Sequence, residues 1–352
     1  MTHADIRLAL PSKGRLELDS LDFLAACSLR VYKPNPRQYQ AVIPAIPGLA
    51  VLFQRPGDIV VGVRSGSIDF GIAGLDVVEE KRGDAERGEV LILHDELGFG
   101  ACALTLAVPE EWGADDLGSA VYHVQTSISP RPVRIATKYP SLTARFLNAH
   151  NFPPFQLIDA EGTLEVAPTI GYADLIADLV SSGQTLRDNR LLPLTDGVIL
   201  KSQACLIANR AALRARPEVL AVARQLLEFV EAHLRAENFF MVTANMRGDS
   251  PEAISQRMFT QPDLRGLQGP TIAPVVPHTE RAIAWHAVNI IVRKDRISQA
   301  VQQLRAIGGS GVIVSPVTYI FEEEPQRYKA MLEALNAKSN DTHRGQCQRQ
   351  SS

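Results

Sequence analysis

The chain has few of the residues from which disulfide frameworks and metal centres are built. Its four cysteines, Cys27, Cys102, Cys205 and Cys347, are widely scattered and form no Cys-x-x-Cys pair, so we expect neither a disulfide framework nor a zinc knuckle. Its eight histidines show no His-Glu-x-x-His or His-x-x-x-His spacing, which argues against a transition-metal site built by the protein. A reducing compartment follows as the simpler interpretation, and we predict a cytoplasmic protein.

Strong charge and long apolar runs are lacking as well. The formal net charge is only −3, which gives no support for binding to nucleic acid or to an anionic membrane. No apolar run approaches membrane-spanning length, and no charged-then-apolar leader precedes Ile6. We therefore expect no nucleic-acid partner and no membrane partner, and any site that handles phosphate must be local.

The 352 residues are too many for one average domain. In the first two thirds, short β-rich runs alternate with helical patterns, which predicts a mostly parallel sheet with helices on both faces. A second such unit starts near Ala101. We predict two lobes around a cleft, with residues 1–100 and 190–236 in lobe I and residues 101–189 in lobe II. The segment Leu97–Gly100 is either a hinge between the lobes or a simple turn.

The last third of the chain has a different pattern. The order of predicted elements over residues 237–325 is β-α-β-β-α-β, the ferredoxin-like plan, with a final strand at Gly311–Phe321. Residues 336–352 are polar and lack periodicity, which predicts a disordered tail. The predicted fold class is thus α/β with an α+β domain at the C-terminus.

One segment, Glu165 to Leu186, combines acidic side chains with a small hydroxyl- and glycine-rich loop. We interpret Ala173–Val180 as a helix in which Asp174 and Asp178, four residues apart, share a face. The loop Ser181–Thr185 allows backbone N–H groups to approach a phosphate closely, and its hydroxyls add donors. Carboxylates beside such a loop suit ribose hydroxyls or Mg²⁺. The alternative is a helix with a solvated acidic face and an ordinary glycine-containing end.

The segment resembles the phosphoribosyl-pyrophosphate loop of the ATP phosphoribosyltransferase family. Further motifs in family order are similar: Leu8–Leu16 to its opening strand and turn, Phe53–Ile59 to its F-x-R-P-x-D-I segment, and Asp69–Asp76 to its D-x-G-I-x-G-x-D turn. Gly269–Pro274 resembles the hinge-like motif of its regulatory domain. The matches span residues 6 to about 320. Gln184 departs from the family pattern, because a small residue is frequent at its position.

The resemblance implies a fold and a reaction. The expected fold is a two-lobed catalytic region like a type II periplasmic binding protein, followed by the ferredoxin-like regulatory domain of the long form. The expected activity is a pentosyl transfer that opens histidine biosynthesis. ATP and phosphoribosyl pyrophosphate condense to N1-(5-phosphoribosyl)-ATP and pyrophosphate, with feedback inhibition by histidine. The expected assembly is a homo-hexamer built from dimers.

The resemblance also assigns roles to residues. Those implied for phosphoribosyl pyrophosphate are Glu165, Asp174, Asp178, Ser181, Ser182, Gly183, Gln184 and Thr185. Those for ATP are Gly74, Leu75 and Asp76, those for catalysis are Lys13, Arg15 and Arg55, and those for histidine are Leu267, Gly269 and Thr271. The cofactor is Mg²⁺, carried mainly by the substrate, with Glu165 or Asp178 as the candidate protein ligands. No general base is assigned, since the nucleophile belongs to ATP and the task of the protein is alignment and charge stabilisation.

Each assignment has a plain structural alternative. Lys13 and Arg15 could simply be solvated surface charges. Arg55 could form an ion pair with Asp58, and Asp76 could be the N-cap of a helix. The histidine candidates suit simple packing at the start of a strand. For the whole chain, the alternatives are a two-lobed binding protein without activity and a regulatory paralogue that has lost catalysis. A dinucleotide-dependent dehydrogenase is disfavoured because the glycine spacing after Gly71 is wrong for its fingerprint.

Overall fold

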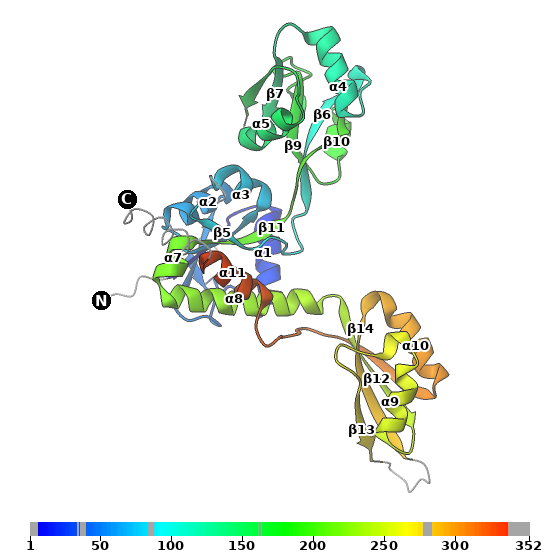
Figure 1. The fold of residues 1–352 in the computed structure, drawn as a ribbon. Coiled ribbons are helices and arrows are strands. Elements are labelled where there is room, and N and C mark those ends of the chain that lie inside the picture. The colour runs from blue at the N-terminus through cyan, green and yellow to red at the C-terminus, as the bar shows by residue number, and fades with distance from the viewer. Residues whose placement is uncertain are drawn as a thin grey trace, which may run out of the picture. The chain divides into compact units, whose positions relative to one another are not determined.

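The computed structural model describes residues 6–33, 35, 40–83, 88–160, 162, 164–276 and 284–336. Contacts within the chain divide it into two units (Figure 1). The first unit runs to Leu227 and takes in the chain again from Gln326, and the second is Glu228–Pro325. Of the tail predicted for residues 336–352, only Asn336 lies within the described residues, as the last residue of a helix.

The first unit contains a six-stranded sheet in the order β2-β3-β1-β4-β11-β5. Its strands are β1 (Ile6–Pro11), β2 (Gln40–Val42), β3 (Leu49–Gln54), β4 (Phe70–Gly74), β5 (Val90–His94) and β11 (Ala204–Asn209). The helices of this part are α1 (Arg15–Ala26), α2 (Pro56–Ser65), α3 (Leu75–Lys81) and α7 (Arg210–Ala215). Helix α8 (Pro217–Ala236) begins in the first unit, and its residues from Glu228 onward belong to the second. Helix α2 starts with Pro56 and packs so closely on β4 that a Cβ atom at Gly71 would lie 2.4 Å from Ile59 Cγ2.

A second, five-stranded sheet in the same unit has the order β10-β6-β9-β7-β8. Its strands are β6 (Cys102–Pro109), β7 (Val133–Thr137), β8 (Phe155–Asp159), β9 (Leu175–Val180) and β10 (Leu191–Ser202). Helices α4 (Leu117–His123), α5 (Pro140–Ala149) and α6 (Gln184–Asp188) accompany it, and α4 continues into a π-helical turn at Val124–Ile128. Read as β8-β7-β9-β6-β10, this order repeats β3-β1-β4-β11-β5 of the first sheet, which confirms the predicted two-lobed, type II binding-protein-like plan.

The helix that we predicted over Ala173–Val180 is wrong. Leu175–Val180 is strand β9, which pairs with β6 on one side and β7 on the other. The short run Leu175–Ala177 is apolar and buried, and such a run is compatible with a buried helix or with a central strand covered on both faces. Pairing with two neighbours selected the strand, and the spacing of Asp174 and Asp178 was a coincidence with the helical repeat.

The return of the chain to the first sheet also differs from our prediction. We placed residues from 190 onward in lobe I, but β10 pairs antiparallel with β6 in the second sheet. The return is made by β11, which pairs with β4 and β5. The two crossings of the chain lie side by side, since Leu97 N–H donates to Ala204 O at 3.0 Å and Ala204 N–H donates to Phe99 O at 2.9 Å.

The second unit has the predicted ferredoxin-like plan. Strands β12 (Phe239–Arg247), β13 (Thr271–Val275), β14 (Trp285–Arg293) and β15 (Gly309–Pro316) form an antiparallel sheet in the order β13-β14-β12-β15. Helices α9 (Pro251–Phe259) and α10 (Ile297–Ala306) cover one face of it (Figure 1). Their Ile254, Met258 and Leu304 pack against Val242 and Val288 of the sheet. Strand β15 ends at Pro316, earlier than the predicted Phe321.

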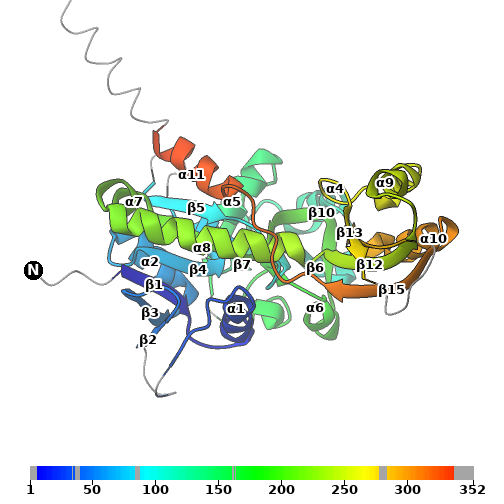
Figure 2. The same cartoon turned by 90° about the horizontal axis from the view of Figure 1, so that it is seen from below.

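A further helix, α11 (Gln326–Asn336), was not predicted. It belongs to the first unit, where it runs alongside α8 (Figure 2). Its Tyr328, Met331 and Leu335 are buried. The apolar face of α11 is therefore covered by the first unit, and the chain passes from the second unit back to the first at Pro325.

Candidate functional site

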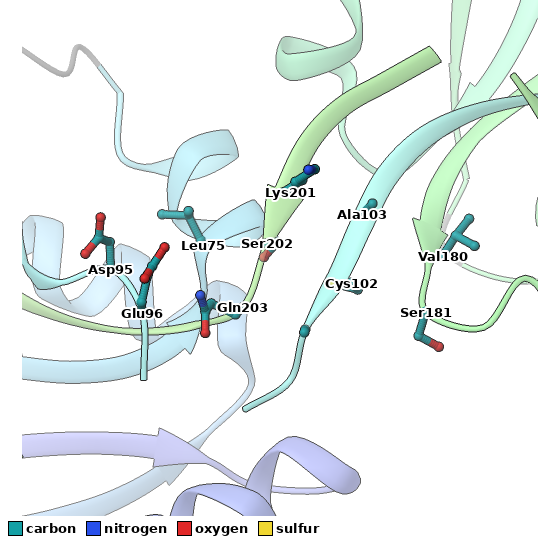
Figure 3. A pocket seen from close by; sticks show the side chains of 11 residues that line it. Leu75, Asp95, Glu96, Cys102, Ala103, Val180, Ser181, Lys201, Ser202 and Gln203 are labelled. Carbon is teal, nitrogen blue, oxygen red and sulfur yellow. The ribbon is translucent and has the colours of Figure 1, made fainter. Parts of the chain in front are cut away.

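The site lies in a pocket of about 490 Å³ in the first unit (Figure 3). Leu75, Asp95 and Glu96 line it from elements next to the first sheet, and Val180 and Ser181 line it from the second. The rest of its lining comes from the two crossings of the chain, at Ala101, Cys102, Ala103, Lys201, Ser202 and Gln203. One residue from the predicted ATP group, Leu75, and one from the predicted phosphoribosyl group, Ser181, thus line the same pocket.

The topology explains why these residues meet. Leu75 follows β4, Asp95 and Glu96 follow β5, and Ser181 follows β9. In open α/β sheets, ligands bind outside the carboxyl ends of the strands, because the loops there converge and backbone groups are free to bind. The two crossings of the chain bring the carboxyl ends from both sheets to the same place.

Asp76 follows the pocket residue Leu75 in the chain, and its carboxylate is buried. Its two oxygens accept hydrogen bonds from the hydroxyls of Ser202 and Tyr139, each at 2.6 Å, and its backbone N–H donates to Ser202 Oγ at 3.0 Å. Tyr139 begins α5 of the second lobe, so this carboxylate joins α3 to the other lobe. Burial, followed by the charge of Asp76, raises the pKa of Tyr139 far above its ordinary value, so the phenol stays protonated. The N-cap alternative is wrong, because no side-chain capping bond is made at the start of α3.

A second carboxylate of α3 supports the same junction. Glu80 accepts from the backbone N–H groups of Ser141 and Leu142, both at 2.9 Å. These N–H groups belong to the first turn of α5, where helical partners are missing and a negative charge is favourable. Helix α3 therefore holds the second lobe through two carboxylates.

The predicted phosphate loop leads from β9 into α6. Gly183 has φ 71°, a left-handed conformation that favours glycine, and it caps the helix. Ser181 and Ser182 are exposed, and the Ser182 hydroxyl oxygen accepts a hydrogen bond from Gln184 N–H at 3.4 Å. The side chain of Gln184 donates to Asp188 at 2.6 Å along α6. The unusual Gln184 is thus bound within its own helix, and its side chain does not fill the loop.

Asp178 and Glu165 lie close enough to influence each other. Burial raises the pKa of Asp178, and the nearby negative charge of Glu165 raises it further. The Leu179 N–H, which donates to Asp178 Oδ1 at 2.8 Å, and the charge of Lys138 act in the opposite direction. A partly buried carboxylate of this kind is suited to a donor such as a ribose hydroxyl. Across the described residues, no group of three or more His, Cys, Asp or Glu side chains is arranged to hold a metal ion.

Asp174 does not lie with Asp178 and Glu165. It precedes β9, at the end of the strand opposite the loop, and its carboxylate is held by Arg131 at 2.6 Å and by Arg134 at 3.0 Å. Although partial burial opposes the effect, hydrogen bonds from these two arginines lower the pKa of Asp174 well below its ordinary value. We had placed Asp174 beside the phosphate loop, and the structure assigns it to an ion-pair cluster that holds β7 and β9 together.

The three predicted cations lie at the carboxyl ends of two neighbouring parallel strands. Lys13 and Arg15 follow β1 and Arg55 follows β3, with Pro11 opposite Gln54 in the register. The Arg15 side chain is 91% exposed and lies 3.4 Å from Asp19. Among the described ion pairs Arg55 has none with Asp58. None of the three is part of the pocket lining.

Several pocket residues were missed from the sequence. Asp95 and Glu96 follow β5, a strand that we did not predict. Lys201 and Gln203 lie at the crossing of the chain, where Gln203 Oε1 accepts from Gly98 N–H at 3.0 Å. The continuous apolar run of Val90–Leu93 is a signal that could have indicated the strand. No local pattern marks the residues at the crossing.

The second unit contains a pocket of about 560 Å³. Leu267, Gly269 and Thr271, which we proposed for an effector, all line it. It carries a cation and an anion, Arg235 and Glu322, whose side chains approach to 3.7 Å. The Arg235 guanidinium also donates to Ile320 O at 2.9 Å. The pocket therefore presents charges of both signs beside the apolar Met241 and Phe321.

The family models and the similar proteins of known function carry the same name. The family model described as ATP phosphoribosyltransferase matches residues 55–231, and the model of the HisG C-terminal domain matches residues 236–319. ATP phosphoribosyltransferase 2, chloroplastic, of Arabidopsis thaliana is 46% identical over 334 residues, which cover 94% of this chain and 80% of that protein. ATP phosphoribosyltransferase of Bradyrhizobium sp. is 31% identical over 337 residues, which cover 93% of this chain and 97% of that protein.

Solved structures are similar over part of the chain. The ATP phosphoribosyl transferase (HisG:HisZ) complex from Thermotoga maritima has a chain with a TM-score of 0.49 and 25% identity, covering 64% of this chain and 98% of that one. The alkanesulfonate-binding protein SsuA from Xanthomonas axonopodis has a TM-score of 0.39 and 14% identity, and the match covers 65% of this chain and 73% of that one.

Replacing Asp174 by Asn is expected to lower the thermal midpoint at pH 7 by roughly 2–4 °C, the shift that about 1 kcal/mol produces in a unit of this size. Because the pKa of Asp174 is lowered on folding, its stabilisation is complete above the unfolded value of about 4 and is lost as the pH falls through the folded value. The difference in thermal midpoint between the Asp174→Asn variant and wild type should therefore become smaller at acidic pH. Asp19→Asn, at the exposed pair with Arg15, is the control, and a gap independent of pH would contradict the assignment.

Replacing Tyr139 by Phe removes one of the two hydroxyls that hold the buried Asp76 carboxylate. We expect the free energy of unfolding to fall by about 1.5–3 kcal/mol, as for the loss of a hydrogen bond to a charged group. The measurement is thermal unfolding monitored by calorimetry. Tyr122→Phe, at a tyrosine that is 69% exposed, should leave the midpoint in place. Equal midpoints for the two variants would show that the bond to Asp76 contributes nothing.

Proposed function

The chain belongs to the ATP phosphoribosyltransferase family, and we propose that it binds ATP and phosphoribosyl pyrophosphate together in the pocket between Leu75 and Ser181. The family reaction is a pentosyl transfer, the first step of histidine biosynthesis, in which ATP and phosphoribosyl pyrophosphate give N1-(5-phosphoribosyl)-ATP and pyrophosphate. Family membership sets aside the binding-protein and dehydrogenase alternatives. The observation that carries the proposal is the shared pocket, to which both predicted half-sites contribute.

Phosphoribosyl pyrophosphate is assigned to the side of the second sheet. Its 5′-phosphate would be held by the backbone and hydroxyl donors of Ser181–Thr185, where Gly183 lets the chain turn closely around an anion. Glu165 and Asp178 would accept hydrogen bonds from the ribose hydroxyls. The raised pKa of Asp178 fits this role, since a partly buried carboxylate gains from such donors.

ATP is assigned to the side of Gly74 and Leu75. A Cβ atom at Gly74 would lie 2.4 Å from Asp76 Oδ1, so glycine lets the chain turn over the buried carboxylate. Because both oxygens of Asp76 already accept from protein hydroxyls, we give this residue a positioning role in place of direct purine contact. Lys13, Arg15 and Arg55 remain predicted to handle substrate charge at the edge of the first sheet.

The proposed chemistry needs no protein nucleophile. N1 of the adenine donates its electron pair to the anomeric carbon of the ribose, the bond from that carbon to the pyrophosphate oxygen breaks, and pyrophosphate leaves with the electron pair. The protein aligns the two substrates and stabilises charge on the leaving group. Lys201 lines the pocket and supplies a positive charge there.

Mg²⁺ is proposed as a cofactor carried by the substrate. Mg²⁺ usually takes most of its ligands from phosphate and water, so one or two protein carboxylates would suffice to hold it. Glu165 and Asp178 are the carboxylates that would complete its coordination. When bound, the ion would neutralise the pyrophosphate and make it a better leaving group.

We also propose that histidine is the effector and that it binds the pocket of the second unit. A free amino acid carries one carboxylate and one ammonium group, and Arg235 and Glu322 offer a partner for each. Leu267, Gly269 and Thr271, which line the same pocket, would contact it as well. Feedback then requires histidine to bind the active and inactive states with different affinity.

The proposed assembly is a hexamer built from dimers, and the proposed compartment is the cytoplasm. Ile313, an exposed apolar side chain on a strand of the second unit, suits burial against another subunit. Among the described residues no helix is long and apolar enough to cross a membrane.

The test of the reaction is a direct assay with both substrates, Mg²⁺ and pyrophosphatase, followed by the ultraviolet absorbance of the N1-substituted purine. Product should require both substrates. Ser181→Ala removes one donor from the loop and should raise KM for phosphoribosyl pyrophosphate by about tenfold, the value of a hydrogen bond to a charged group. Ser119→Ala, in α4 away from the pocket, is the control. Folded protein that binds both substrates without making product would indicate the inactive paralogue.

The test of the effector site is histidine inhibition of the same assay. Glu322→Gln removes the anion of the second pocket, and we expect the inhibitory concentration of histidine to rise by about tenfold while turnover without histidine is unchanged. Glu323→Gln, at the next position in the chain, is the matched control. Inhibition that is the same in both variants would place the effector elsewhere.

A further inference from the structure

Helix α11 lies beyond both family-model matches, which end at residues 231 and 319. It is nevertheless bound to the first unit by several specific contacts. Near its C-terminal end, Arg210 donates to Ala334 O at 3.1 Å and Arg214 donates to Leu335 O at 2.6 Å. Guanidinium groups at this end satisfy carbonyls that lack helical partners and complement the helix dipole.

The N-terminal end of α11 contacts a residue that lines the proposed substrate pocket. The Arg327 guanidinium lies 2.6 Å from Asp95 Oδ1, and Asp95 is one of the residues that line the pocket. Tyr328, the next residue, is buried and has the Arg224 guanidinium 5.6 Å from its ring centroid. The backbone that carries Arg327 is therefore anchored, which reduces the entropy lost when the arginine binds Asp95.

The next pocket residue, Glu96, is held by a hydrogen bond to the end of β5. His94, the last residue of β5, accepts a hydrogen bond from Glu96 N–H at 3.2 Å through Nδ1. Burial, followed by the positive charge of Arg327, lowers the pKa of His94 to about 4, so the ring is neutral at physiological pH and Nδ1 keeps its lone pair. Asp95 raises that pKa, but its effect is the smaller one.

Two carboxylates in the lining of this pocket, those of Asp95 and Glu96, need a chemical explanation because both substrates are polyanions. A carboxylate accepts hydrogen bonds and repels phosphate. Asp95 and Glu96 lie on the side of Leu75, away from Ser181 (Figure 3). The donors that ATP can offer on that side are the ribose hydroxyls and the exocyclic amine of its purine.

We propose that Asp95 binds a donor group of the ATP nucleoside and that Arg327 of α11 is the residue that positions Asp95 for this contact. The inference rests on the proposed placement of ATP beside Leu75. It makes a helix from the far end of the chain a part of the substrate pocket, acting through one side chain. Arg327 itself does not line the pocket, so its effect must pass through Asp95.

The experiment is steady-state kinetics and equilibrium ATP binding on the full chain with Arg327→Ala, Asp95→Asn, the double variant and Arg327→Lys. Each single variant should raise KM for ATP by about five- to tenfold, as for one hydrogen bond to a charged group. Turnover at saturating ATP and KM for phosphoribosyl pyrophosphate should stay within about twofold. Arg327→Lys should restore most of the ATP affinity, and Arg327→Ala should add nothing in the Asp95→Asn background.

Arg214→Ala is the matched control, because it removes a guanidinium contact to α11 at the end away from the pocket. It should leave KM for ATP unchanged. An equal rise in KM for Arg214→Ala and Arg327→Ala would overturn the proposal in favour of general helix docking. An Arg327→Ala effect that persists without the Asp95 charge, or that appears in KM for phosphoribosyl pyrophosphate, would overturn it too. Failure of the proposed function is distinct, since wild type would then make no product.

Discussion

The buried carboxylate of Asp76 is the contact on which the geometry of the site depends. It accepts from Ser202 on β10 and from Tyr139 at the start of α5, at 2.6 Å in both cases. A buried carboxylate without such donors would be strongly destabilising, so the start of α3, the end of β10 and the start of α5 have to meet at one point. Glu80 adds the first turn of α5 to the same junction. The pocket forms beside this junction because the elements that carry its lining are held there.

The pocket also follows from the repetition of one sheet order in two lobes. Each sheet presents the carboxyl ends of its parallel strands to the chain crossings, where loops after β4, β5 and β9 converge. Half of a two-substrate site can then be built from each lobe. A reaction that joins two phosphorylated molecules needs this arrangement, because its main requirement is alignment and not an activated side chain.

The two aspartates of the segment around β9 show how neighbouring residues of one type acquire different roles. Asp174 and Asp178 are the same residue type in the sequence, but Asp174 precedes β9 and Asp178 lies within it. Arg131 and Arg134 form ion pairs with Asp174, whereas Asp178 is partly buried and lies near Glu165. The neighbours of each carboxylate, and not its spacing from the other, decide which can bind a ligand.

The sequence by itself determined most strands and helices, the ferredoxin-like order of the second unit and the family, because apolar periodicity and ordered motifs are local signals. It also placed Leu75 and Ser181 in a common site. It could not decide whether Leu175–Val180 is helix or strand, where β10 belongs, or that Tyr139 and Ser202 hold Asp76. Asp95, Lys201 and helix α11 join the pocket region only through contacts between residues far apart in the chain. Tertiary structure decided these points, because strand pairing and the burial of charge depend on which distant groups become neighbours.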